Sequence, residues 1–184
     1  YLAPKAPHAP FTPAPRHAGL FPGGLRVPRT AAWNESGGTQ GGHCSWIGDL
    51  PPVFIALDGK VELTQGTRNR CLDLEAFFID YGRQDRIEGE FVSAILLPRG
   101  PAPYLRCYKI SKRFDQDISA LCGCFNIGVE NGKVASANIA FGGMAGIPKR
   151  AAHVAQTLIG KAWTIESLAT VKSEWSNDFT PIDD

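Results

Sequence analysis

Short blocks of alternating hydrophobic and polar residues predict that much of the chain folds as antiparallel strands. Residues 60–74 alternate on either side of Gln65-Gly66, which is the pattern of a β-hairpin. A second hairpin is predicted over residues 118–141, because its central Asn131-Gly132 favours a type I′ turn with positive φ at both positions. Two further strands are expected, over residues 90–97 and 104–111.

Helical signals stand before the first hairpin and dominate the end of the chain. Asp49 ahead of Pro51 is typical of a helix start, since proline fits the first turn, and Gly59 is expected to end that helix. A helix is also predicted from Pro148, where apolar residues recur at helical spacing, and Thr164 is expected to cap another. Strands followed by helices indicate an α+β fold, with C-terminal helices packed on an antiparallel sheet.

The first 38 residues differ from the rest, because Pro4, Pro7, Pro10 and Pro13 recur at every third position. That period is the turn of a polyproline II helix, so these prolines would share one edge. Two interpretations stay open: a recognition ligand for an aromatic groove, or an extended tail or linker. The segment holds four basic residues and one acidic residue, so the remainder has a net charge of −2.

Composition limits the classes of function. The net charge of +1 does not indicate a nucleic-acid partner. The longest apolar run, residues 51–57, is far shorter than the roughly 20 residues of a membrane-spanning helix, so we expect no membrane partner. A chain of 184 residues suffices for one domain or two small lobes. Because it begins with Tyr1, we expect a piece of a longer protein.

The five cysteines are an odd number in a chain of ordinary size, which favours reduced thiols and a cytoplasmic location over a disulfide framework. Cys122-Gly-Cys124 has one intervening residue, whereas zinc and iron–sulfur ligand pairs usually have two or more. We therefore predict no metal site. On a strand, Cys122 and Cys124 would point to the same side as buried structural thiols.

No catalytic motif is present, and adjacent His43 and Cys44 would point apart on an extended backbone, so we predict no catalytic residue. Two segments could still bind a ligand. In the Gly41-Gly42…Asp49 loop, backbone N–H groups could meet a phosphate or a ribityl chain, while Asp49 could bind a hydroxyl or only cap the helix. Residues 109–117 hold three cations and two carboxylates, which could equally be a solvated loop.

Four motifs identify a resemblance: YKISKRFDQDISALCGCFNI (108–127), IAFGGMAGIPKRA (139–151), IGDLPPVFIAL (47–57) and DLEAFFIDYGRQDR (73–86). They closely resemble the FAD-binding small subunit of bacterial xanthine dehydrogenases, that is, the C-terminal part of the molybdopterin-dehydrogenase flavin domain with its CO dehydrogenase flavoprotein C-terminal lobe. The likeness covers about residues 39–184. It implies a partial second FAD-binding lobe at 39–100 and a truncated C-terminal lobe at 101–184, and it leaves the proline-rich tail at 1–38 outside the family region.

The resemblance also implies an activity. In this family electrons from purine hydroxylation at a molybdenum cofactor pass through 2Fe–2S clusters to FAD and then to NAD. The expected cofactor of this chain is FAD, and the other cofactors belong to absent domains or to a partner. The implied partners are a molybdenum-binding large subunit, an iron–sulfur domain and NAD. The cofactors carry the chemistry, and the protein orients them.

The residues that match flavin contacts of the family lie in several segments. Arg113 to Asp117 would lie near the isoalloxazine edge. The implied FAD-binding residues are Thr39, Gly41, Gly42, His43, Asp49, Val92 and Lys109.

The first flavin loop departs from the family pattern. Gln40 replaces an apolar residue, His43 replaces an asparagine, and about three residues are missing before Asp49. A shortened loop must reroute its backbone N–H groups. The resemblance also leaves only part of a flavin site in this chain, and FAD gains affinity from burial on several sides, so we expect the isolated chain to bind FAD weakly or not at all. The alternative is a non-catalytic docking module for a molybdenum-containing partner, with a degenerate flavin loop.

Overall fold

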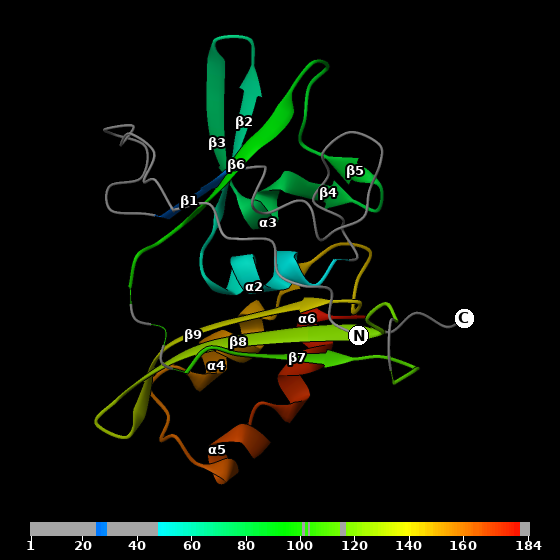
Figure 1. Cartoon of the computed structure of the whole chain (residues 1–184). Coiled ribbons are helices and arrows are strands. Elements are labelled where there is room, and N and C mark those ends of the chain that lie inside the picture. The colour runs from blue at the N-terminus through cyan, green and yellow to red at the C-terminus, as the bar shows by residue number, and fades with distance from the viewer. Residues whose placement is uncertain (1–24, 29–47, 101, 103, 115–116, 181–184) are drawn as a thin grey trace.

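The computed structural model describes residues 25–28, 48–100, 102, 104–114 and 117–180. Two four-stranded antiparallel sheets lie one above the other, with helix α2 (Leu50–Ala56) between them (Figure 1). The mixed composition of helices and antiparallel strands confirms the predicted α+β class. The proline repeat and the loop from Thr39 to His43 lie outside the described residues.

The first sheet has the strand order β1-β6-β2-β3. The predicted hairpin is confirmed as β2 (Lys60–Gln65) and β3 (Arg68–Asp73), joined through Gly66 at φ 58°. Strand β6 (Phe91–Leu97) is the predicted buried strand. Strand β1 (Leu25–Pro28) pairs antiparallel with β6 at the sheet edge, so part of the proline-rich segment belongs to the fold. An edge position suits Pro28, because proline cannot donate to a strand ladder.

Short elements precede and follow the β2–β3 hairpin of the first sheet. Helix α2 is where the prolines predict it, but the left-handed residue after it is Asp58 at φ 55°, not Gly59. Gly59 is needed for space instead, since a Cβ there would lie 2.7 Å from the carbonyl oxygen of Phe54. After β3 come α3 (Leu74–Phe77), β4 (Phe78–Asp80) and β5 (Arg83–Gln84).

The second sheet has the order β10-β9-β8-β7. The second predicted hairpin is confirmed as β8 (Leu121–Glu130) and β9 (Lys133–Gly142), with Asn131 at φ 51° and Gly132 at φ 72°. Strand β7 (Arg106–Ile110) forms one edge, and all five of its residues are exposed. The two-residue strand β10 (Lys149–Arg150) pairs with β9 at the other edge of the sheet.

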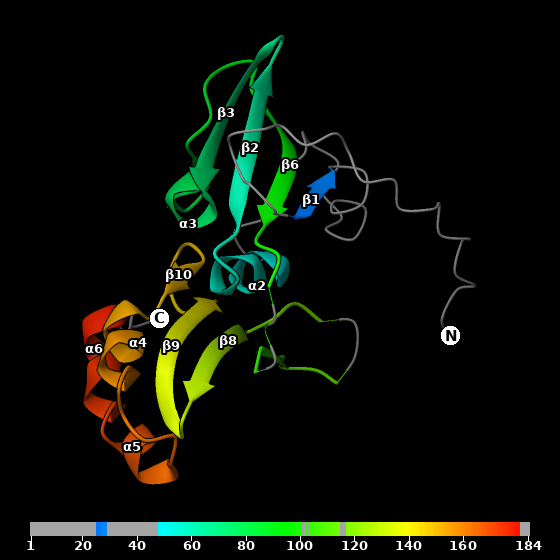
Figure 2. The same cartoon turned by 90° about the vertical axis from the view of Figure 1, so that its left-hand side faces the viewer.

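The C-terminal helices pack on one face of this sheet (Figure 2). They are α4 (Ala152–Leu158), α5 (Ile165–Ala169), a 3₁₀ turn (Lys172–Glu174) and α6 (Trp175–Asp178). The Thr164 cap is confirmed, since its side chain accepts a hydrogen bond from the N–H of Ser167. The start predicted at Pro148 is wrong, because Lys149 and Arg150 first pair with β9 as β10. None of the helices in the described part of the chain is long and apolar enough to span a bilayer.

Two hydrophobic cores lie on opposite faces of the second sheet. The first core joins the first sheet and α2 to residues of β8 and β9, among them Ile55, Leu63, Phe77, Cys124 and Ala140. The second core fills the space between the sheet and helices α4 and α6, with Ile139, Phe141, Val154, Leu158 and Phe179. Because the first core is shared, the two sheets are packed as neighbours rather than only linked by the chain.

Arg150, in strand β10 of the second sheet, forms ion pairs with two carboxylates near the first sheet. Its guanidinium lies 3.0 Å from Glu75 and 2.9 Å from Asp58, and its backbone N–H donates to Glu75 at 2.9 Å. These two carboxylates belong to α3 and to the turn after α2.

The buried carboxylate of Asp178 caps helix α4 from outside the helix. It accepts hydrogen bonds from the N–H groups of His153 and Val154, both at 3.0 Å, and lies 2.8 Å from Nδ1 of His153. Burial alone would raise the pKa of Asp178, but these donors outweigh burial and hold the pKa below its ordinary value. Asp178 thus replaces the side-chain cap that Ala151 cannot supply.

We predict that Asp178→Ala lowers the free energy of unfolding by about 2 kcal/mol at neutral pH, because the N–H groups of His153 and Val154, one partly and one fully buried, lose their acceptor. A folded-state pKa below the unfolded one gives stability above about pH 4 that is lost as the pH falls through the folded pKa. Urea unfolding from pH 7 to acid should therefore show the two proteins converging.

Asp73→Ala is the matched control, since that carboxylate is exposed and pairs with Lys60. An exposed pair contributes about 0–1 kcal/mol, so this variant should stay close to the parent. Equal losses in the two variants would contradict the capping role of Asp178.

Candidate functional site

Asp49 lies between helix α2 and the second sheet. It precedes α2, but its side chain makes no capping hydrogen bond. Its carboxylate instead faces the second sheet, where Oδ2 lies 3.0 Å from Nζ of Lys109 and Oδ1 accepts a short hydrogen bond from the hydroxyl of Ser119. Of the two interpretations of Asp49 left open by the sequence, the structure therefore rejects a purely capping role.

The Asp49–Lys109 pair remains accessible to a ligand. The side chains of Asp49 and Lys109 are 41% and 46% exposed. An ion pair in that setting contributes at most about 1 kcal/mol, so a ligand group can compete for either partner. Each carboxylate oxygen has two lone pairs, so Asp49 can still accept a hydrogen bond from a ligand hydroxyl.

A small pocket of about 90 Å³ adjoins this cluster. Glycines dominate its wall. A Cβ on Gly142 would lie 3.1 Å from Cγ of Pro52, and one on Gly143, at φ 90°, would lie 2.4 Å from the carbonyl oxygen of Ala120. The residues that line the pocket are Gly48, Tyr81, Ser119, Cys122, Gly142, Gly143, Ala145 and Gly146.

These residues fit part of a flavin cofactor. The carboxylate of Asp49 accepts, the ammonium group of Lys109 donates, and the bare backbone of the glycines permits close approach. This combination suits the hydroxyl-rich ribityl chain and the diphosphate of FAD. A pocket of 90 Å³ holds only a fragment of such a molecule, so the remaining contacts must come from elsewhere.

The thiols beside the cluster are buried, as predicted. Cys122 and Cys124 are 4% and 0% exposed, both belong to the first core, and the thiol of Cys122 lies 3.7 Å from the backbone oxygen of Asp49. A hydrogen bond from Cys124 lowers the pKa of Cys122, while the same bond and burial raise the pKa of Cys124. Within the described ranges, no group of three His, Cys, Asp or Glu side chains could hold a metal ion.

The segment after Lys109 is held by a local ion pair. Asp117 accepts from the backbone N–H of Arg113 at 3.0 Å, from its guanidinium at 2.9 Å, and from the N–H of Ile118 at 3.0 Å. The guanidinium of Arg113, helped by these backbone donors, lowers the pKa of Asp117. The structure therefore separates Lys109, which pairs with Asp49, from the Arg113–Asp117 pair farther along.

Val92 does not share the surface of the Asp49 cluster. Its side chain is 1% exposed and packs in the first core, so a backbone contact with FAD stays a prediction. Thr39, Gly41, Gly42 and His43 lie outside the described residues, and their predicted contacts are untested.

Ser119 and Tyr81 are members of the site that the sequence did not indicate. Ser119 follows the charge-rich segment but belongs to no motif of its own, and its partner Asp49 is 70 residues away. Both residues do lie inside the segments that carry the family resemblance, 108–127 and 73–86, which is the one signal that could have suggested them.

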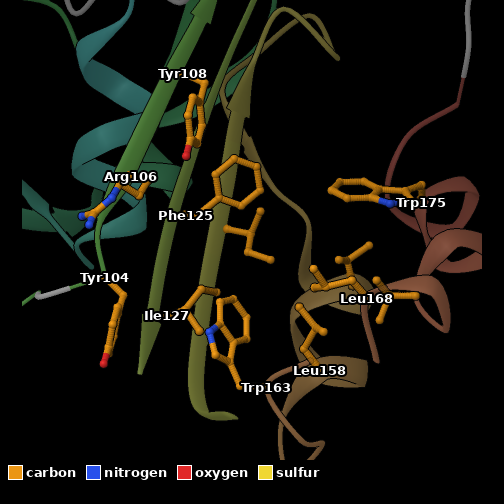
Figure 3. Close-up of a pocket in the computed structure, with 12 residues that line it drawn as sticks. Tyr104, Arg106, Tyr108, Phe125, Ile127, Leu158, Trp163, Leu168 and Trp175 are labelled. Atoms are coloured by element: carbon orange, nitrogen blue, oxygen red, sulfur yellow. The ribbon is translucent and has the colours of Figure 1, made fainter. Parts of the chain in front are cut away.

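A second cavity, of about 380 Å³, lies on the opposite face of the second sheet (Figure 3). Its wall is mainly aromatic and aliphatic, with Tyr108 and Phe125 on the strands facing Leu168 and Trp175 on the helical side. Its lining holds no carboxylate and is mostly apolar, in contrast to the polar Asp49–Lys109–Ser119 cluster.

Sequence comparison matches two families to consecutive parts of the chain. Residues 36–100 match the FAD binding domain in molybdopterin dehydrogenase, and residues 106–184 match the CO dehydrogenase flavoprotein C-terminal domain. Xanthine dehydrogenase 1 of Arabidopsis thaliana is 30% identical over 128 residues, which are 66% of this chain and 9% of that protein. The glyceraldehyde dehydrogenase medium chain of Sulfolobus acidocaldarius is 27% identical over 150 residues, 80% of this chain and 53% of that protein.

Solved structures share the fold at lower identity. The Cu,Mo-CO dehydrogenase matches with a TM-score of 0.67 and 21% identity, over 74% of this chain and 48% of that chain. Quinoline 2-oxidoreductase from Pseudomonas putida 86 matches with a TM-score of 0.66 and 18% identity, over 77% and 49%. The chain thus spans about a tenth of the xanthine dehydrogenase relatives and about half of the matched solved chains.

We predict that Gly143→Ala destabilises the fold by about 1–3 kcal/mol, because the new methyl group would meet Ala120 and the positive φ disfavours a side chain. Urea unfolding measures the loss. Gly100→Ala is the control, since no atom lies within 4 Å of a Cβ there. A Gly143→Ala protein as stable as the parent would show that the pocket wall tolerates a side chain.

Proposed function

We propose that this chain binds FAD at the Asp49–Lys109–Ser119 cluster and relays electrons as one component of a larger oxidoreductase. The chain corresponds to the FAD-binding region of a member of the molybdopterin dehydrogenase family. One observation carries the proposal. Asp49 comes from the part that matches the FAD binding domain, whereas Lys109 and Ser119 come from the part that matches the flavoprotein C-terminal domain. The cluster is therefore an accessible polar contact between the segment that matches the FAD binding domain and the segment that matches the flavoprotein C-terminal domain.

Each residue of the cluster has a distinct role in this proposal. Asp49 accepts a hydrogen bond from a cofactor hydroxyl, and Ser119 holds the carboxylate in the required orientation. Lys109 balances the charge of Asp49 and adds positive potential for an anionic ligand. The glycines at 142 and 143 keep the pocket wall free of side chains. FAD itself supplies the redox chemistry, accepting electrons singly or in pairs.

For the whole assembly we propose hydroxylation of hypoxanthine or xanthine on a molybdenum-binding partner, with an iron–sulfur domain upstream and NAD as the final acceptor. The sequence motifs resemble xanthine dehydrogenases, and several matched relatives bear that name. Other relatives are named for nicotinate, glyceraldehyde, quinoline or CO, so the family accommodates several reducing substrates. The free thiols among the described residues support a cytoplasmic setting.

The alternative is a docking module that no longer holds FAD. The shortened first loop, with Gln40 and His43 at its altered positions, favours it. The two functions differ in one property, the affinity of the chain for FAD.

We predict that Asp49→Asn weakens FAD binding about tenfold, or about 1.4 kcal/mol, because the neutral amide oxygen accepts a hydrogen bond less strongly than the carboxylate and no longer pairs with Lys109. Quenching of flavin fluorescence during a titration measures the affinity. Asp73→Asn removes the same charge from the first sheet and should leave the affinity unchanged.

If the parent chain binds FAD too weakly to measure, the comparison is repeated after His43→Asn and insertion of three loop residues before Asp49. Binding that is rescued by the loop and lost again with Asp49→Asn supports the proposal. No binding in any form, or binding indifferent to Asp49, favours the docking module.

A further inference from the structure

Cys107 and Cys124 lie directly opposite each other on adjacent strands. They are Cα partners in the antiparallel register of β7 and β8. Opposed residues of such a pair are about 4.5–5.5 Å apart at Cα and point to the same face. A disulfide spans about 4.4–6.8 Å between Cα atoms, so the two strands already hold these residues at bonding separation. The thiol of Cys124 also interacts with that of Cys107.

The two thiols differ in access. Cys107 is exposed on the edge strand, whereas Cys124 is 0% exposed in the first core. A small oxidant in solvent can therefore reach the thiol of Cys107, while the adjacent thiol of Cys124 is shielded. This arrangement of an accessible thiol beside a resolving thiol is typical of redox-sensitive cysteines.

The third thiol of the group, Cys122, is a poor partner for Cys124. The two are separated by one residue on the same extended strand. At about 3.3–3.4 Å per residue their Cα atoms are about 6.7 Å apart, at the upper limit for a disulfide. Of the two pairings open to Cys124, the backbone geometry therefore favours the cross-strand one with Cys107.

We propose that Cys107 and Cys124 form a reversible cross-strand disulfide when the protein meets a peroxide. The thiol of Cys107 reacts with hydrogen peroxide to give a sulfenic acid and one water. The sulfur of Cys124 then attacks the sulfenic sulfur, and a second water leaves with its proton. Overall two thiols lose two electrons and two protons to one peroxide, which becomes two waters, and a dithiol reductant reverses the change.

The bond would restrain the strand that carries Lys109. In the described sheet, β7 pairs with β8 alone, and all of its residues are exposed, so little burial holds it. Lys109 is two residues from Cys107 and on the same face, where it pairs with Asp49. Oxidation would therefore fix the position of Lys109 beside Asp49, a consequence independent of whether FAD binds there.

The test uses a Cys44→Ser, Cys71→Ser variant, which retains three of the five cysteines. We expect hydrogen peroxide to remove two free thiols per folded chain, and peptide mapping to find Cys107 joined to Cys124. Dithiothreitol should restore both thiols. Amide hydrogen exchange of β7 should slow after oxidation.

Two further variants serve as controls. With Cys107→Ser added, both remaining thiols should survive the same treatment, because the accessible partner is gone. With Cys122→Ser added instead, the disulfide should still form. A bond between Cys122 and Cys124, sulfinic acid at Cys107 without a bond, or equal thiol loss in the Cys107→Ser protein would each overturn the proposal. Far-UV circular dichroism checks that every variant is folded.

Discussion

The close approach of helix α2 to the second sheet is the constraint on which the site depends. Small residues make it possible: Cys122, Cys124 and Ala140 form the buried floor, and Gly142 lies under Pro52, where a Cβ would come within 3.1 Å of the ring. This contact places Asp49, just before the helix, against Lys109 and Ser119 from the other half of the chain. A larger residue on the floor would lift α2 and separate the carboxylate from both partners.

The two-residue period of the strands separates two kinds of chemistry on one sheet. On β7, Cys107 and Lys109 share the face of α2 and Asp49, whereas Arg106 and Tyr108 line the apolar cavity on the helical side. On β8 the same alternation places Cys122 and Cys124 toward α2 and Phe125 toward the cavity. The polar Asp49–Lys109–Ser119 cluster and the apolar cavity therefore lie on opposite faces of a single sheet.

Local signals predicted the local structure well. The Asn131-Gly132 turn, the Gln65-Gly66 hairpin and the Thr164 cap depend on neighbouring residues, and the structure confirms all three. The site could not be predicted in the same way. The two partners of Asp49 are 60 and 70 residues away in sequence, and a local pattern does not indicate contacts at that separation. The resemblance indicated Asp49 and Lys109, but Ser119 required the fold. Likewise β10 displaced the predicted helix start, since pairing with β9 outweighed the helical preference of its two residues.

The most direct test of the account is whether FAD contacts Asp49 itself. Carbon-13 labelling of the aspartate carboxyl groups allows each to be followed by NMR while FAD is added, with the resonances assigned by substitution. The account predicts a saturable shift of the Asp49 resonance and no shift at Asp73, which lies in the first sheet. Saturable FAD binding that leaves Asp49 unmoved would contradict the assignment of the site.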